Sequence, residues 1–154
     1  MHLLTLLFIL TSVLSPTTAR IIGFSVPRSI ASNTTVRFSL HTERYIQRVT
    51  DVSVAVGFYP PPSYPKTVGY FITTSYLGPQ NSNVLKDIPV EVYVPDKTTL
   101  GLARLGGPTV VTAEVHSLYG VLGMPTSALF NVTVDIGDRT SEEHVMSDGW
   151  VWLD

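Results

Sequence analysis

The sequence predicts an all-β fold, an antiparallel β-sandwich of about seven strands like that of immunoglobulin or fibronectin-III domains. Residues 20–154 contain 19 Val, 7 Ile and 14 Thr but only 5 Ala and 3 Lys, a composition that disfavours helices and suits half-buried sheets. Apolar and polar residues alternate in several short runs, as they do in strands with one buried face. Residues rich in Pro, Gly and Asn separate the runs. A small β-barrel is the alternative architecture.

The first 19 residues have the features of a secretory signal peptide. An almost continuous apolar run covers residues 3–14. As a helix it would extend about 18 Å, too short for the ~30 Å hydrocarbon core of a bilayer. Small residues at Thr17 and Ala19 predict cleavage between Ala19 and Arg20, although a buried N-terminal strand or helix is an alternative. No later run reaches membrane length, so we expect a secreted, extracellular protein without membrane insertion.

Seven runs are predicted to be strands of a single domain that covers residues 20–137. The alternation is clearest at residues 52–58, 88–94 and 130–136. Weaker runs lie at residues 21–26, 34–40, 68–76 and 110–118. The chain has no cysteine, so it lacks the disulfide of immunoglobulin domains and the fibronectin-III variant is the nearer one. Stability then depends on the packed core alone.

Three segments fall outside these strands. Residues 95–108 contain Gly101, Gly106 and Gly107, which predicts a mobile loop over a sheet edge. Residues 59–65 contain four prolines, which predicts a stiff extended loop that displays Tyr59 and Tyr64, although a plain connector is the alternative. Residues 138–154 carry five acidic residues against one Arg, which predicts a disordered acidic C-terminal tail. Trp150 and Trp152 are unusual in such a tail, and docking on the body of the protein is expected more than binding a partner.

The composition excludes several classes of function. A net charge of −2 with few charged residues does not give the basic surface of a nucleic-acid-binding protein. His41, His116 and His144 have no partner at metal-ligand spacing, and no Gly-x-Ser-x-Gly motif is present, so no metal, cofactor or serine nucleophile is expected. A carboxylate pair for glycoside hydrolysis remains open, although the acids near predicted strands suit solvated positions better. These acids are Glu43, Glu91 and Glu114.

Two sequons predict N-linked glycosylation, at Asn33 and Asn131. Asn33 lies in a turn before a predicted strand. Asn131 alternates with Phe130 and Val132, so its side chain is expected to point outward.

Seven short motifs occur in order along the chain. They are ARIIG at 19–23, SVP at 25–27, TERYIQ at 42–47, DVSVAVG at 51–57, SYLGP at 75–79, SLYG at 117–120 and FNVTV at 130–134. Together they resemble the necrosis-inducing secreted protein family, whose members are small fungal effectors of plant infection. The resemblance covers residues 20–138 and does not include the acidic segment that follows.

The resemblance implies a protein that acts by binding and not as an enzyme. It implies suppression of pattern-triggered plant immunity through inhibition of host receptor-like and receptor-associated kinases, and cell death, in the host apoplast and cytoplasm. We expect a monomer whose contact surface uses exposed aromatic and loop residues. The candidates are Tyr45, Tyr59, Tyr64, Tyr76, Leu77 and Pro79.

Two alternatives stay open at this point. Tyr76 and Tyr119 could serve as core or turn residues instead of contact residues. The whole protein could instead be a carbohydrate-binding module of cell-wall polysaccharide, in which aromatic rings stack on sugars. Its candidate rings are Tyr59, Tyr64 and Trp150.

Overall fold

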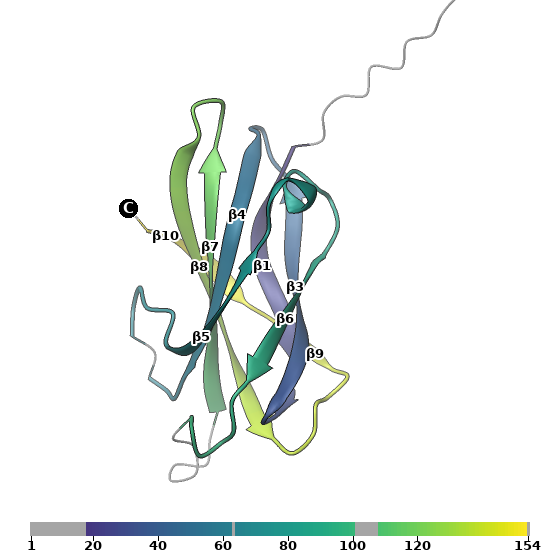
Figure 1. Ribbon diagram of the computed structural model, residues 1–154, viewed down its shortest axis with the longest axis vertical. Helices are drawn as coiled ribbons and strands as arrows, with labels where there is room; N and C mark the ends of the chain where they lie inside the picture. Colours follow the sequence, from purple (N-terminus) through teal and green to yellow (C-terminus); the bar gives the residue numbers. More distant parts are fainter. Residues whose placement is uncertain (1–17, 63, 101–107, 154) are drawn as a thin grey trace, which may run out of the picture.

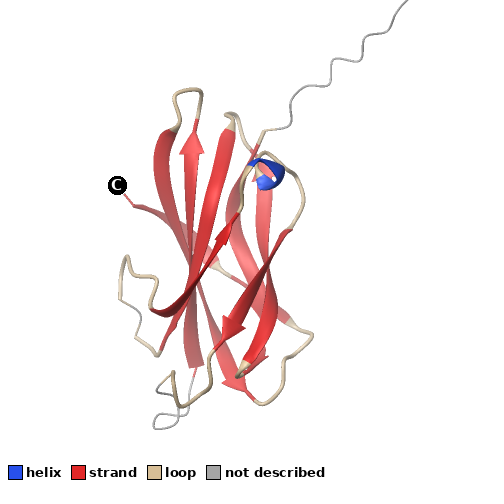
Figure 2. Cartoon of the chain, viewed as in Figure 1, coloured by secondary structure: helices blue, strands red, loops and turns tan. Residues whose placement is uncertain are grey.

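The structure is a computed structural model that describes residues 18–62, 64–100 and 108–153. Most of the predicted signal peptide and residues 101–107 of the predicted loop therefore lie outside the described residues. Figures 1 and 2 show a molecule built almost wholly from strands, with one short 3-10 helix, η1. The elements are β1 (Ala19–Pro27), β2 (Ser29–Ala31), β3 (Thr34–Arg44), β4 (Val49–Tyr59), β5 (Tyr70–Tyr76), η1 (Pro79–Asn81), β6 (Ile88–Val94), β7 (Pro108–Tyr119), β8 (Met124–Gly137), β9 (His144–Met146) and β10 (Asp148–Leu153).

These strands form two sheets. The first has four strands in the order β6-β3-β1-β9. The second has six strands, five of them in the order β10-β8-β7-β4-β5, with β2 pairing in parallel with β8. Every other pairing is antiparallel. Figure 1 shows the two groups of strands side by side along the long axis of the molecule.

One hydrophobic core joins the two sheets. Phe24 of β1 and Phe38 of β3 stack with ring centroids 6.1 Å apart, and both side chains are buried. Val54 and Phe58 of β4 and Phe130 of β8 belong to the same buried cluster. Burial removes each of these side chains from water, a gain of roughly 1.5–3 kcal/mol per side chain before the entropy cost. Since no disulfide is present, this packing carries the stability of the fold.

The structure confirms the all-β class and places a strand at each of the seven predicted runs. The alternation of residues 88–94 corresponds to a strict alternation of buried and exposed side chains along β6. The closer likeness to immunoglobulin or fibronectin-III domains, and the barrel alternative, remain predictions.

The prediction of a disordered tail at residues 138–154 is corrected by the structure. β9 pairs with β1 in the first sheet, and β10 pairs with β8 in the second. Ser147 lies between them, where its backbone N–H donates to the Phe24 carbonyl and its Oγ accepts from the Phe24 N–H. The edges of β1 and β8 would otherwise have unpaired backbone N–H and C=O groups. A segment can form hydrogen bonds with these groups whatever the charge of its side chains.

Candidate functional site

β5 forms an exposed edge of the six-stranded sheet. β5 pairs with β4 on one side only and ends the sheet. Tyr70, Phe71, Ile72 and Tyr76 are between 45% and 73% exposed, so β5 displays apolar side chains on both faces. Natural proteins usually protect such an edge with charges or prolines, because it can pair with another chain. We call these four side chains and their strand the β5 edge.

A backbone irregularity shapes the β5 edge. Phe71 has a φ of 53°, in the left-handed region that a bulky residue rarely adopts. The register shifts at this point, so that Phe71 and Ile72 both lie opposite Gly57 of β4. The bulge presents the Phe71 ring at the surface beside Tyr70, with ring centroids 6.4 Å apart. Strained residues of this kind occur most often at functional sites.

Tyr76 is held in place at the other end of the strand. Its ring lies against Gly78, which has a φ of 70° and where a Cβ atom would collide with the ring. The ring is nevertheless 73% exposed. An exposed tyrosine ring next to a glycine turn is a candidate anchor for a partner.

The direction of the backbone donors follows from one hydrogen bond. The Leu77 N–H donates to the Val52 carbonyl of β4 at 3.0 Å. Because N–H groups alternate in direction along a strand, those of Thr74 and Tyr76 point away from β4. The β5 edge therefore offers both outward donors and aromatic side chains.

The predicted partner-binding residues separate into two groups. Tyr64, Tyr76 and Pro79 are exposed, so they remain candidates. Tyr59 and Leu77 are only 4% and 3% exposed, so they offer little contact area, although Tyr59 lines two surface cavities with Tyr64. Tyr59 is the last paired residue of β4, with Gly69 against its ring, and Leu77 packs in the core cluster. Tyr45 belongs to a different site.

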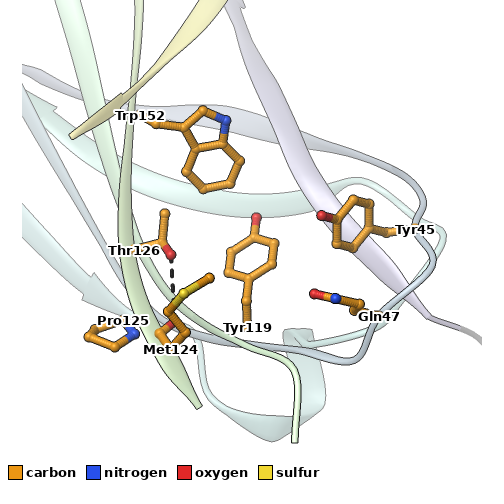
Figure 3. A pocket seen from close by; sticks show the side chains of 7 residues that line it. All are labelled: Tyr45, Gln47, Tyr119, Met124, Pro125, Thr126 and Trp152. Carbon is orange, nitrogen blue, oxygen red and sulfur yellow. Dashed lines mark hydrogen bonds between the residues drawn. The ribbon is translucent and has the colours of Figure 1, made fainter. Parts of the chain in front are cut away.

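A second site is an aromatic pocket of about 360 Å³ near the start of β8. Figure 3 shows the Tyr119 ring between the rings of Trp152 and Tyr45. Tyr119 meets them edge to face, at 5.3 Å from Trp152 and 5.7 Å from Tyr45. The Arg20 guanidinium carbon lies 4.6 Å from the centroid of the Tyr45 ring, a cation–π distance. The remaining lining residues are Gln47, Met124, Pro125 and Thr126.

Charge and burial keep Tyr119 neutral. Burial, and then the negative charge of Asp51, raise the pKa of Tyr119 to about 12. The hydroxyl group therefore stays protonated at any physiological pH. Trp152 confirms that this part of the C-terminal segment packs on the body of the protein. Tyr119 is a buried packing residue, as the alternative reading of the sequence proposed.

The structure also reveals a chain of polar groups that sequence spacing did not indicate. His41 Nε2 lies 2.8 Å from Ser25 Oγ, and His41 Nδ1 lies 2.9 Å from Asp87 Oδ1, the order of a catalytic triad. β1 is paired on both sides at Ser25, with Ser39 and Met146, so the sheet uses the backbone donors that an oxyanion hole would need. Within the described residues, no group of three His, Asp or Glu side chains could hold a metal.

Both sequon asparagines are exposed. Asn33 lies in the turn between β2 and β3 with a φ of 57°, and its Oδ1 accepts a hydrogen bond of 2.7 Å from the Tyr93 hydroxyl. Asn131 points outward from β8, as predicted. Glycosylation at both positions stays a prediction.

In the described part of the chain, no helix has the length and apolar character needed to cross a membrane.

Comparison with known proteins gives consistent results. The Nis1 family matches residues 17–135. The chain is 35% identical to necrosis-inducing secreted protein 1 of Colletotrichum orbiculare over 98% of its own length and 90% of the relative. It is 41% identical to necrosis-inducing secreted protein 1 of Colletotrichum higginsianum over 84% of its length and 86% of that relative. The chain therefore belongs to the Nis1 family and is a secreted, extracellular protein.

Proposed function

We propose that this protein is a secreted fungal effector that binds host receptor-associated immune kinases and lowers their activity. Pattern-triggered immunity is thereby suppressed, and cell death follows when the effector is abundant. Membership of a family whose relatives are named necrosis-inducing secreted proteins supports the effector role. The observation that carries the binding mechanism is the β5 edge, with its outward donors and exposed rings.

The β5 edge suits an extended peptide segment as its target. A strand added to an open edge gains main-chain hydrogen bonds, and side-chain contacts give the selectivity. Tyr70 and Tyr76 lie at the two ends of β5 and could flank such a segment. A rigid two-sheet body reduces the entropy cost of binding. Kinase domains carry extended activation segments, which makes them targets of suitable shape.

Binding alone explains this function without catalysis. The Ser25–His41–Asp87 chain has the triad order, but β1 is paired on both sides of Ser25. No bond in the host kinase needs to be made or broken for inhibition by contact. The carbohydrate-binding alternative is less well supported, since Tyr59, one of its candidate rings, is only 4% exposed, while Tyr64 is 68% exposed. Sugar rings stack best on exposed flat faces.

The test is Thr74→Pro, which removes an outward donor of β5. Proline keeps an extended φ but has no N–H, so it is tolerated on a strand edge that faces solvent. We expect the variant to melt near the wild type and to bind the kinase domains of plant receptor-associated kinases at least tenfold more weakly. Binding is measured by titration calorimetry or by co-precipitation.

Thr74→Val is the matched control, because it retains the N–H and the strand propensity at the same position. It should bind as the wild type does. Tyr76→Ala should weaken binding about thirtyfold if the ring is an anchor. Unchanged binding by Thr74→Pro and by Tyr76→Ala would remove the kinase contact from the β5 edge.

A further inference from the structure

We propose that one end of the molecule docks on the surface of a lipid bilayer with anionic headgroups. The docking tip consists of four side chains, Ile46 of the β3–β4 turn and Val121, Leu122 and Met124 of the β7–β8 hairpin. They are 89%, 100%, 99% and 63% exposed, respectively. The tip is separate from the β5 edge, and the proposal does not depend on kinase binding.

The fold itself gives no reason for apolar residues at this position. Gly120 and Gly123 have φ values of 71° and 67°, so the two glycines provide the left-handed backbone that the hairpin needs. The two residues between them are free to be any turn residue, and Asn, Asp or Ser would be usual. Val121 and Leu122 are instead fully exposed to water. Exposed apolar groups that contribute nothing to packing indicate an interaction surface.

The two turns lie side by side and form one patch. The Gly120 N–H donates to the Arg48 carbonyl at 2.9 Å, and Val49 pairs with Tyr119 at the base of the hairpin. Figure 1 shows both turns at the same end of the molecule, beyond the start of β4. The four tip side chains are therefore able to contact a flat apolar layer together.

The charges around the tip fit an anionic surface. Arg44 and Arg48 flank Ile46, are exposed, and have no ion-pair partner among the described residues. Glu43, which adjoins Arg44 in the sequence, is paired with Arg20 at 2.7 Å. Each basic residue at a negatively charged leaflet favours binding about fivefold.

Acidic residues gather at the opposite end. β8 runs from Met124 at the tip to Gly137, a length of roughly 45 Å at 3.4 Å per residue. Around and beyond that far end lie Asp135, Asp138, Glu142 and Glu143, of which Asp138 and Glu143 are paired with Lys97 and Arg28. A molecule with its tip on the bilayer would point these acids away from the lipid phosphates. The two arginines of the tip favour an anionic bilayer over a neutral protein surface as the partner.

Aromatic residues lie directly behind the tip. Tyr45 and Trp152 line the same pocket as Met124. Amphipathic rings of this kind are enriched at the headgroup level of membrane proteins. Docking of this type requires no spanning segment, so it agrees with the lack of a long apolar run after residue 19. The four tip residues come together only in the folded chain.

The test is sedimentation of the purified protein with vesicles of phosphatidylcholine alone and of phosphatidylcholine with phosphatidylserine. We expect binding to the mixed vesicles that weakens with added salt, since the contribution of exposed charges is screened. Val121→Ser with Leu122→Ser should lower the partition coefficient at least tenfold. Arg44→Gln with Arg48→Gln should lower it for the mixed vesicles only, by about fivefold for each arginine.

Met146→Ser is the control, because it also removes an exposed apolar side chain but on β9. It should bind vesicles as the wild type does, and every variant should keep the wild-type melting curve. Equal vesicle binding by the wild type and the Val121/Leu122 variant would overturn the proposal. The proposal would also be overturned if the wild type bound neither kind of vesicle.

Discussion

Asp51 is a buried carboxylate of β4 and lies opposite the buried Ser117 of β7. Its side chain is 1% exposed and accepts a hydrogen bond of 2.7 Å from the Ser117 hydroxyl. Its own backbone N–H donates to Ser82 Oγ at 2.9 Å, which ties the segment after η1 to β4. Burial raises the pKa of Asp51 to about 6, although the Ser117 hydrogen bond acts in the opposite direction. The ionised form is therefore costly in the folded protein.

This cost makes the stability depend on pH. The folded pKa lies above the unfolded value of 3.8, so the folded state binds more protons between pH 4 and pH 6. The contribution of Asp51 is thus most favourable below pH 4 and is lost as the pH rises through 6. At about 1.4 kcal/mol for each pKa unit, ionised Asp51 lowers the free energy of unfolding at pH 7 by about 3 kcal/mol. An acidic extracellular fluid would stabilise the fold.

Asp51→Asn should remove this dependence, because the amide is neutral at every pH and its oxygen can still accept from Ser117. We expect the difference in unfolding free energy between variant and wild type to grow between pH 4 and pH 6.5. Urea melts of both proteins across that range measure it. Asp96 and Asp138 have pKa values lowered by hydrogen bonds with Thr99 and Lys97, and they contribute equally to both proteins. Parallel pH profiles would show that Asp51 is not the responsible group.

At the scale of elements, β9 and β10 join the two sheets at their edges. Only Ser147 separates them, so the chain passes from the first sheet to the second within one residue. β9 covers the edge of β1 and β10 covers the edge of β8. The segment with the least strand-like sequence therefore protects two edges that would otherwise be open to aggregation.

A chain that ends at Asp138 should be clearly less stable than the full chain. It loses the pairing on β1 and β8 and the contact of Trp152 with Tyr119. We expect a melting temperature lower by about 10 °C or more, and increased aggregation. Circular dichroism melts and size-exclusion chromatography measure the two effects.

The matched control halves the net charge of residues 138–154, from −4 to −2, without shortening the chain, as Glu142→Gln with Asp148→Asn. Both residues are exposed, so the variant should melt within a few degrees of the wild type. If truncation left the melting temperature unchanged, β9 and β10 would contribute nothing to the fold.

The strands in which apolar and polar residues alternate were predictable from the sequence, and the short strands without this alternation were missed. Residues 130–136 place Phe130 inside and Asn131 outside, as their period of two requires. β9 has only three residues, and its pairing with β1 joins residues about 120 positions apart, which no local pattern can reveal. The exposure of the candidate contact residues also depends on packing between distant segments. Tyr64 and Tyr76 are exposed and Tyr59 is not, although each of the three lies within three residues of a proline in the sequence.

At the scale of the whole molecule, three surfaces have different chemistry. The docking tip carries exposed apolar side chains and two arginines, the far end of β8 carries acidic residues of which two are paired with Arg28 and Lys97, and the β5 edge follows one side of the six-stranded sheet. The two contacts that we propose use different surfaces. A bilayer contact at the tip would leave the β5 edge accessible to a partner.

The predicted signal-peptide cleavage falls within β1. Ala19 is 1% exposed and pairs with Arg44, while Arg20 pairs with Glu43 through both the ladder and the salt bridge. Cleavage between Ala19 and Arg20 would remove one terminal pair and keep the rest of β1. N-terminal sequencing of protein collected from the culture medium should read Arg-Ile-Ile-Gly from residue 20. A different first residue would show that the signal peptide is cleaved at another position.

The position of Trp150 and Trp152 has an optical consequence. They are the two tryptophans of the chain, and both lie on β10. The indole of Trp152 is half-buried and meets Tyr119 edge to face. Indole emission moves to longer wavelength in water, and energy transfer from nearby tyrosines ends when the rings separate. Intrinsic fluorescence, which reports the opening of the core in many proteins, would here report whether the last strand is in place.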